Sequence, residues 1–208
     1  MTFSSCLVEQ SPPIVLDASV IINLLATGHV DTILQALPGA SCVTENVVVE
    51  IKGGAENGRP ESKKLFDLIE RGRLEVVELD EEALESFIGI VSGSASDSLG
   101  DGEAATLAFA HRNGRIAAID ERKATRVAAE RFGSLRIATT IDILAHTPVR
   151  LALGQEGLST AVLDALRLAR MQVWAQQFDW VVEQIGAANV VSCPSLRRLA
   201  KKLPETIA

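Results

Sequence analysis

The feature that most constrains the fold is a regular alternation of short apolar runs and helical patterns between residues 14 and 146. The first run, residues 14–16, is short and largely β-branched, and it stops at Asp17. Short apolar runs of this kind are typical of strands buried on both faces of a parallel sheet. The alternation therefore predicts an α/β fold, a three-layer sandwich with a mainly parallel central sheet.

The pattern also sets approximate element limits. Strands are expected at residues 14–16, 41–43, 74–79, 115–119 and 135–138. Helices are expected at residues 19–25, 30–37, 45–52, 61–70, 80–91, 103–111, 121–132 and 140–146. Ser19 and Thr44 are suitable N-caps for two of these helices.

The last part of the chain follows a different pattern. Residues 158–185 predict one long helix, and a short helix is expected after Pro194. We therefore predict two domains, an α/β domain at residues 1–148 and a C-terminal helical extension at residues 149–208. Trp174 and Trp180 in the extension indicate either an oligomer interface or ordinary core packing.

Composition excludes several classes. Of the 208 residues, 47% are hydrophobic and 23% are charged, which is typical of globular proteins rather than disordered chains. No apolar run approaches the ~20 residues that a membrane span needs. The N-terminus lacks the pattern of a secretory signal. The three cysteines, Cys6, Cys42 and Cys193, are far apart, which argues against a disulfide framework and a thiolate zinc site. We expect a cytoplasmic protein without membrane contact.

Charge is unevenly distributed along the chain. The formal net charge is −7, yet residues 1–110 carry 6 Lys or Arg against 18 Asp or Glu, whereas residues 111–208 carry 14 against 9. An acidic half could hold metal ions and a basic half could face phosphates. Ordinary variation of surface charge would produce the same imbalance.

Four carboxylates are expected at one edge of the sheet. Asp17 and Asp120 follow strands, and Glu50 and Glu103 lie on helices that start at the same edge. Each acid alone could simply cap a helix, favour its N-terminus or face solvent. Together they require a counter-charge, and oxygen ligands of this kind favour Mg²⁺ or Mn²⁺ over zinc.

Four segments of the chain resemble the conserved motifs of PIN-domain ribonucleases. They are residues 14–23 (IVLDASVIIN), 44–51 (TENVVVEI), 102–110 (GEAATLAFA) and 118–126 (AIDERKATR). The third and fourth look most like a PIN-like branch of prokaryotic proteins that is kin to the toxins of virulence-associated toxin–antitoxin pairs. The resemblance implies a catalytic, metal-binding set of Asp17, Glu50, Glu103 and Asp120, with Mg²⁺ or Mn²⁺ as cofactor.

The resemblance extends to further residues, with two departures. Ser19 would be a hydroxyl that orients Asp17 or a bound water. Thr44 stands where relatives often have proline, and Glu103 where the toxins usually have aspartate. Asp101 could share or replace the metal-binding role of Glu103. Arg122 and Arg126, one helical turn apart, are candidates for contacts with RNA phosphates, or else ion-pair partners of the acids.

The function expected from these observations is metal-dependent hydrolysis of RNA phosphodiester bonds by an endoribonuclease. The family further implies that the chain could be the toxin of a toxin–antitoxin pair, with an antitoxin protein as partner and a homodimer as its assembly. The alternative is a catalytically weak PIN-like module that binds RNA or a protein. A phosphatase of the haloacid dehalogenase kind is disfavoured, because it needs a second aspartate where Ser19 stands.

Overall fold

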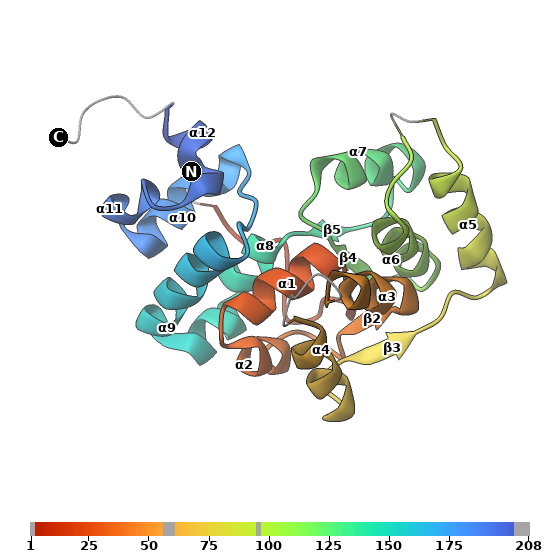
Figure 1. Ribbon diagram of the computed structural model, residues 1–208, viewed down its shortest axis with the longest axis horizontal. Helices are drawn as coiled ribbons and strands as arrows, with labels where there is room; N and C mark the ends of the chain where they lie inside the picture. The colour runs from red at the N-terminus through yellow and green to blue at the C-terminus, as the bar shows by residue number, and fades with distance from the viewer. Residues whose placement is uncertain (1–2, 56–60, 95–96, 202–208) are drawn as a thin grey trace.

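The central element is a five-stranded sheet in which every described pair of strands is parallel. The computed structural model describes residues 3–55, 61–94 and 97–201 (Figure 1). The strands are β1 (Ile14–Leu16), β2 (Cys42–Thr44), β3 (Glu75–Val77), β4 (Ile116–Ala118) and β5 (Ile137–Ala138). Their order is β3-β2-β1-β4-β5, so β1 lies in the middle. The parallel sheet between helices confirms the predicted α/β class.

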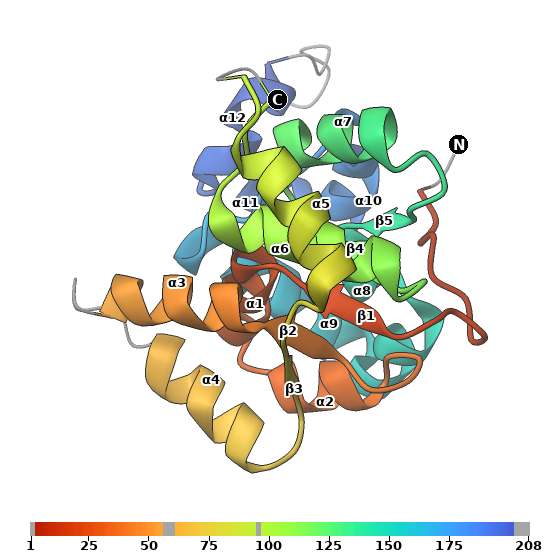
Figure 2. The ribbon, with the colours of Figure 1, turned by 90° about the vertical axis from the view of Figure 1, so that its right-hand side faces the viewer.

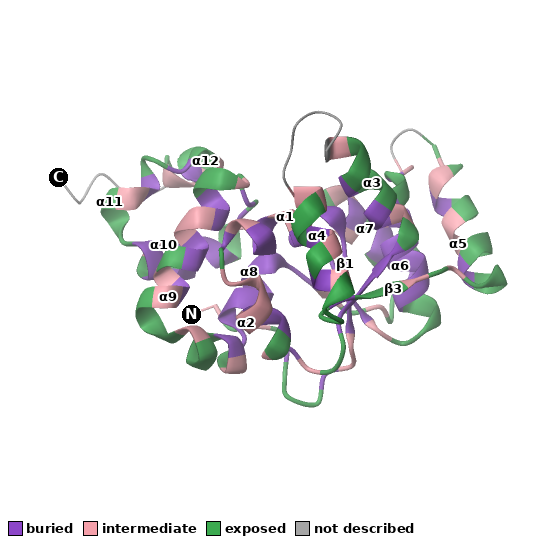
Figure 3. Ribbon diagram, turned by 60° about the horizontal axis from the view of Figure 1, so that its bottom comes forward, coloured by how far each residue is buried: buried purple, intermediate pink, exposed green. Residues whose placement is uncertain are grey.

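Helices cover both faces of this sheet and separate the core into two clusters. In β1, Ile14 and Leu16 pack into one cluster, whereas Val15 between them packs into the other, as alternation along a strand requires. Figure 2 shows the sheet between two groups of helices, α1 to α4 with α8 and α9 on one side and α5 to α7 on the other. Figure 3 shows that buried residues line the sheet-facing sides of these helices.

The helices of the α/β part follow the predicted order closely. They are α1 (Ala18–Ala26), α2 (Val30–Gln35), α3 (Glu45–Ala55), α4 (Glu61–Glu70), α5 (Glu81–Val91), α6 (Asp101–Arg112), α7 (Arg122–Arg131) and α8 (Thr140–Ala145). One predicted cap is wrong. The N-cap of α1 is Asp17 and not Ser19, because the Asp17 carboxylate accepts a hydrogen bond from the Ser19 backbone N–H. Aspartate and serine are equally good caps, so composition alone does not separate them.

The predicted long helix at residues 158–185 is also wrong. Helix α9 (Thr147–Leu168) ends at Leu168, and the chain then runs without regular structure to the 3₁₀ turn η1 (Ala175–Gln177) and helix α10 (Phe178–Ile185). The break occurs at Arg170, whose φ is +57°. Neither glycine nor proline lies between residues 168 and 178, so the sequence carries no breaker signal there. The chain continues with α11 (Ala187–Val190), η2 (Pro194–Leu196) and α12 (Arg197–Ala200).

The C-terminal helices pack on the α/β part without a separate core. Leu158 of α9 and Ile185 of α10 belong to the same buried cluster as Leu16. Trp180 is buried, and its ring meets Phe3 edge-on at a centroid distance of 6.2 Å, which is core packing. The boundary expected between residues 148 and 149 falls within α9 and stays a prediction. Residues 1–2 and 202–208 of the two predicted domains lie outside the described residues.

No helix in the described part of the chain is both long and apolar enough to span a membrane.

Candidate active site

Asp17 stands at the carboxyl end of the central strand with half of its carboxylate unpartnered. Its backbone N–H donates to the Ala118 carbonyl at 3.1 Å, which joins β1 to β4 at this point. Oδ2 accepts from the Ser19 hydroxyl at 2.8 Å and from the Ser19 N–H at 3.2 Å. Oδ1 is buried and has no hydrogen-bond partner. Burial raises the pKa of Asp17, while its bonds to Ser19 act in the opposite direction.

Asp120 follows β4 and is held by three donors. Its Oδ1 accepts from the Thr140 N–H at 2.8 Å, and its Oδ2 accepts from the Thr140 hydroxyl at 2.5 Å and from Asn23 Nδ2 at 2.7 Å. Burial raises the pKa of Asp120 to about 6 despite these bonds. The carboxylate is therefore fixed in orientation and costly to ionise without a nearby cation.

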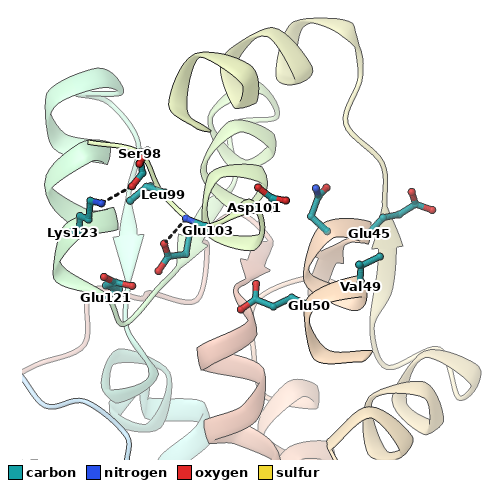
Figure 4. Close-up of a pocket in the computed structure, with 11 residues that line it drawn as sticks. Glu45, Val49, Glu50, Ser98, Leu99, Asp101, Glu103, Glu121 and Lys123 are labelled. Atoms are coloured by element: carbon teal, nitrogen blue, oxygen red, sulfur yellow. Dashed lines mark hydrogen bonds between the residues drawn. The ribbon is translucent and has the colours of Figure 1, made fainter. Parts of the chain in front are cut away.

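Glu103 meets an acid that the sequence analysis did not select. Glu103 lies in the first turn of α6, where its Oε2 accepts from the Gly100 N–H at 3.3 Å. Its carboxyl group also shares a hydrogen bond with Glu121, and the two side chains point toward one another in Figure 4. Burial, with this hydrogen bond and the charge of Glu121, raises the pKa of Glu103 to about 8. The Glu103 carboxyl group is therefore costly to ionise beside Glu121.

Glu50 reaches the site from α3 across a glycine of α6. A Cβ atom at Gly102 would collide with Glu50 Oε2, so the glycine provides the room that this carboxylate occupies. The Glu50 side chain is exposed to solvent on one side. Partial burial raises the pKa of Glu50, and the charges of Asp17 and Asp101 add to the effect. Asp101 is exposed at the rim beside Glu50.

Two adjacent clefts are lined by several of these carboxylates, but buried Asp17 is not among the lining residues of either cleft. The main cleft has a volume of about 750 Å³, and its lining includes Glu45, Glu50, Asp101, Glu103, Glu121 and Lys123 (Figure 4). The side cleft, of about 240 Å³, is lined by residues that include Ser19, Asn23, Asp120 and Arg170. Glu103 and Glu121 line both, so the two clefts meet at this pair.

The four predicted metal ligands are brought to one edge of the sheet. Asp17 is the centre of the set, because its charge contributes to raising the pKa of Glu50, Glu103 and Asp120. The donors are all carboxylate oxygens, and Asp17 Oδ1 is a buried acceptor that needs a partner. Both features fit a hard divalent cation such as Mg²⁺ or Mn²⁺. Within the described residues, however, no three His, Cys, Asp or Glu side chains are already arranged to hold a metal ion.

The two arginines predicted to contact RNA lie beside the clefts rather than in them. Arg126 is exposed and pairs with Asp97 at 3.2 Å and with Glu130 at 3.0 Å. Arg122 is exposed at the start of α7, and neither arginine is among the lining residues of the two clefts. Lys123, between them, lines the main cleft, and its ammonium group donates to the Ser98 carbonyl at 2.5 Å.

Sequence reasoning missed three polar groups of the site. Glu121 directly follows Asp120, so its position after a strand could have identified it in the same way as Asp120. Asn23 and Thr140 hold Asp120 from α1 and α8, and no spacing rule links either of them to Asp120. Only the packing of the two helices against β4 shows that they meet this carboxylate.

Comparison with known proteins gives the family. No curated protein matches the chain. A family model described as a PIN domain matches residues 13–186, which include every carboxylate described above. PIN domains are generally nucleases and typically use divalent metals, in agreement with the acidic edge of this sheet. On the strength of this match over most of its length, the chain belongs to the PIN-domain family.

Proposed function

We propose that this protein is an endoribonuclease that hydrolyses RNA phosphodiester bonds with the help of Mg²⁺ or Mn²⁺. The observation that carries the proposal is the buried, unpartnered Oδ1 of Asp17 at the centre of three further carboxylates with raised pKa values. A group of acids in this state favours a divalent cation, because the cation supplies the charge that ionisation lacks.

Each residue has a distinct task in this proposal. Asp17, Glu50, Glu103 and Asp120 would hold the metal, and Asp101 lies at the rim close enough to influence Glu50. Ser19 fixes the orientation of Asp17 through Oδ2, which leaves Oδ1 without a hydrogen-bond partner. Asn23 and Thr140 fix Asp120 in the same way. When bound, the metal would offset negative charge on the phosphoryl oxygens and activate water as the nucleophile.

Glu103 and Glu121 are suited to handle a proton. Burial and the neighbouring Glu121 raise the pKa of Glu103 to about 8, so the Glu103 carboxyl group holds its proton more tightly than a free glutamate does. Glu103 would be a ligand of the cation, and Glu121 would lie at the edge of the same cleft. Glu121 is then placed to accept a proton from the water that attacks the phosphodiester.

The acidic lining of the clefts supports a role for a cation in RNA binding. Among the described residues, the lining of the main cleft contains five carboxylates and one lysine. A polyanion is repelled by such a surface until part of its charge is neutralised. The antitoxin partner and the homodimer implied by the family resemblance stay predictions.

The test is cleavage of a mixed RNA pool by the purified protein with Mn²⁺ or Mg²⁺. Parallel reactions contain EDTA, the Asp17→Asn variant, or the Glu75→Gln variant as a control at the opposite end of the sheet. We expect cleavage that EDTA and Asp17→Asn abolish and that Glu75→Gln leaves unchanged. Cleavage by Asp17→Asn at the wild-type rate would contradict the proposal. RNA binding without cleavage by the wild-type protein would favour the alternative, a binding module.

A further inference from the structure

The segment after α9, residues 169–177, forms a strap that lies against the acidic edge of the sheet. It begins where α9 ends, with the N–H groups of Ala169 and Met171 donating to the Ala165 carbonyl at 3.3 and 3.0 Å. Between them, Arg170 is the one non-glycine residue with positive φ in the described part of the chain. An L residue other than glycine, asparagine or aspartate rarely adopts this backbone conformation. Backbone conformations of this kind are strained and occur frequently at functional sites, so the Arg170 side chain is a candidate functional group.

The strap is anchored directly to the site. The Trp174 indole N–H donates to the backbone carbonyl of Asp120 at 3.2 Å. Gln177 Nε2 donates to the Thr139 hydroxyl at 2.8 Å, next to the residue that holds Asp120. Met171 and Val173 are buried between these anchors. The strap is thus tied to the ends of β4 and β5, and the position of Arg170 relative to Asp120 is fixed by packing.

Arg170 lines the side cleft together with Glu103, Asp120 and Glu121. It is the one basic residue among the described residues that line this cleft. The side chain is exposed and makes no hydrogen bond or ion pair within the described part of the chain. By contrast, the guanidinium of Arg126 is already paired with Asp97 and Glu130. Arg170 therefore retains its donors for a ligand.

We propose that Arg170 binds a phosphate group of the RNA strand beside the metal-binding carboxylates. The guanidinium presents paired N–H donors that match two phosphate oxygens, and it supplies positive charge where the lining is otherwise acidic. Residues 169–172 of the strap line the side cleft together with Glu103 and Glu121, so the RNA strand would pass between the strap and this pair. The inference rests on the proposed function for its substrate class, and it assigns to the C-terminal helical part a direct role in substrate binding.

The test compares Arg170→Ala, Arg170→Lys and Arg170→Gly with Arg150→Ala, a control at an exposed arginine near the start of α9. Arg170→Gly removes the side chain and also relieves the positive φ, so it guards against a variant that fails to fold. Binding of a fluorescent single-stranded RNA in Mn²⁺ is measured over a range of salt concentrations, together with KM, kcat and the affinity for Mn²⁺ alone.

We expect the alanine and glycine variants to bind RNA about tenfold more weakly, as for the loss of one charge-assisted contact. The slope of log Kd against log salt should become shallower by about 0.7, the value for one phosphate contact on a single strand. KM should rise with little change in kcat, Mn²⁺ affinity should stay unchanged, and Arg170→Lys should be intermediate. The Arg150→Ala variant should match the wild type.

The outcomes separate this inference from the proposed function. Wild-type RNA binding that Arg170→Ala and Arg170→Gly leave unaltered in affinity and salt slope overturns the inference and leaves the nuclease proposal standing. Weaker RNA binding by both variants, in a wild type that binds without cleaving, supports the inference and contradicts the nuclease. A wild-type protein that neither binds nor cleaves RNA in Mn²⁺ overturns both.

Discussion

The two ends of the sheet are made from the same five strands but differ in chemistry. At the carboxyl ends lie Asp17 and Asp120, with further acids from α3 and α6. At the amino ends a cleft of about 430 Å³ is lined by a mixture that includes Leu34, Ser41, Arg73 and Glu75. Among the described residues, burial and neighbouring acids raise the pKa of several carboxyl groups together at the carboxyl ends alone.

The difference follows from the geometry of a parallel sheet. Helices α1 and α8 begin at the carboxyl ends, so their N-termini present backbone N–H groups there. Asp17 caps α1, and Asp120 accepts from the first N–H of α8. These donors stabilise carboxylates at an edge where side chains from separate strands converge. The amino ends lack this convergence, so we expect changes there to leave metal binding and catalysis unaltered.

Among the variants that test the difference between the two ends of the sheet, Gly102→Ala is expected to have the largest effect on Mn²⁺ affinity. The added methyl group would collide with Glu50 Oε2 and displace that carboxylate from the site. We expect Mn²⁺ affinity to fall by about 10–100-fold, as for the loss of a group that supports a metal site. The free energy of unfolding should stay the same or rise by about 0.5–1 kcal/mol, because alanine favours a helix over glycine.

The matched control is Gly157→Ala in α9, where the new Cβ would lie 3.6 Å from Leu153 Cβ, an ordinary contact. Calorimetric Mn²⁺ titration and thermal unfolding of both variants measure the two effects. Equal Mn²⁺ affinity in Gly102→Ala and Gly157→Ala would show that Glu50 does not contribute to the site.

A smaller effect is expected from Thr140→Val. This change removes the hydroxyl that donates to Asp120 Oδ2, which should cost about 1–2 kcal/mol of stability. The same bond lowers the pKa of Asp120, so its loss should move the acid side of the pH–activity profile to higher pH. Thr140→Ser keeps the hydroxyl and should retain the wild-type profile. Superimposable profiles for the valine and serine variants would argue against Asp120 as an ionised site residue.

The raised pKa values also predict how stability depends on pH in EDTA. The pKa of Asp120 rises from 3.8 to about 6 and that of Glu103 from 4.5 to about 8 on folding. The folded state therefore binds protons more tightly than the unfolded chain, and this contribution to stability is full at low pH and lost as pH rises toward 8. We expect Tm in EDTA to fall over this range, by about 2–4 °C for each kcal/mol lost.

Addition of Mn²⁺ should reduce that fall, because the metal stabilises the ionised carboxylates of the folded state. Thermal unfolding followed by circular dichroism, with and without Mn²⁺, measures both curves. Identical curves would mean that the metal does not bind at the carboxyl ends.

The smallest effect is expected from Arg126→Ala. Its ion pairs with Asp97 and Glu130 are exposed, so their loss should change stability by no more than about 0.5 kcal/mol. Because this guanidinium is already paired and lies outside both clefts, RNA affinity should change less than in Arg122→Ala. Filter-binding assays on the two variants provide the comparison. A larger loss of RNA affinity in Arg126→Ala than in Arg122→Ala would indicate that Arg126 does contact an RNA phosphate.

Sequence reasoning reached the fold and the main acids because both depend on local patterns. Short β-branched runs between helical patterns predicted the parallel sheet. The positions of Asp17 and Asp120 after predicted strands identified them as candidate site residues. The role of Arg170 could not be predicted in this way, because the residues around it have good helical propensity and the helix ends there through tertiary packing. The contacts of Asn23 and Thr140 with Asp120 likewise depend on how α1 and α8 pack. The close approach of Glu50 to Gly102 likewise depends on tertiary packing, because it joins two helices that are distant in sequence.

The most direct test of the central claim is a Mn²⁺ titration of the wild-type protein, Asp17→Asn and Glu75→Gln. The titration is carried out at a pH above the pKa of Glu103, which is raised to about 8, so that this carboxyl group is ionised. The account predicts saturable binding by the wild type and Glu75→Gln, and its loss in a folded Asp17→Asn variant. Equal binding by all three proteins would place the metal elsewhere and contradict the account.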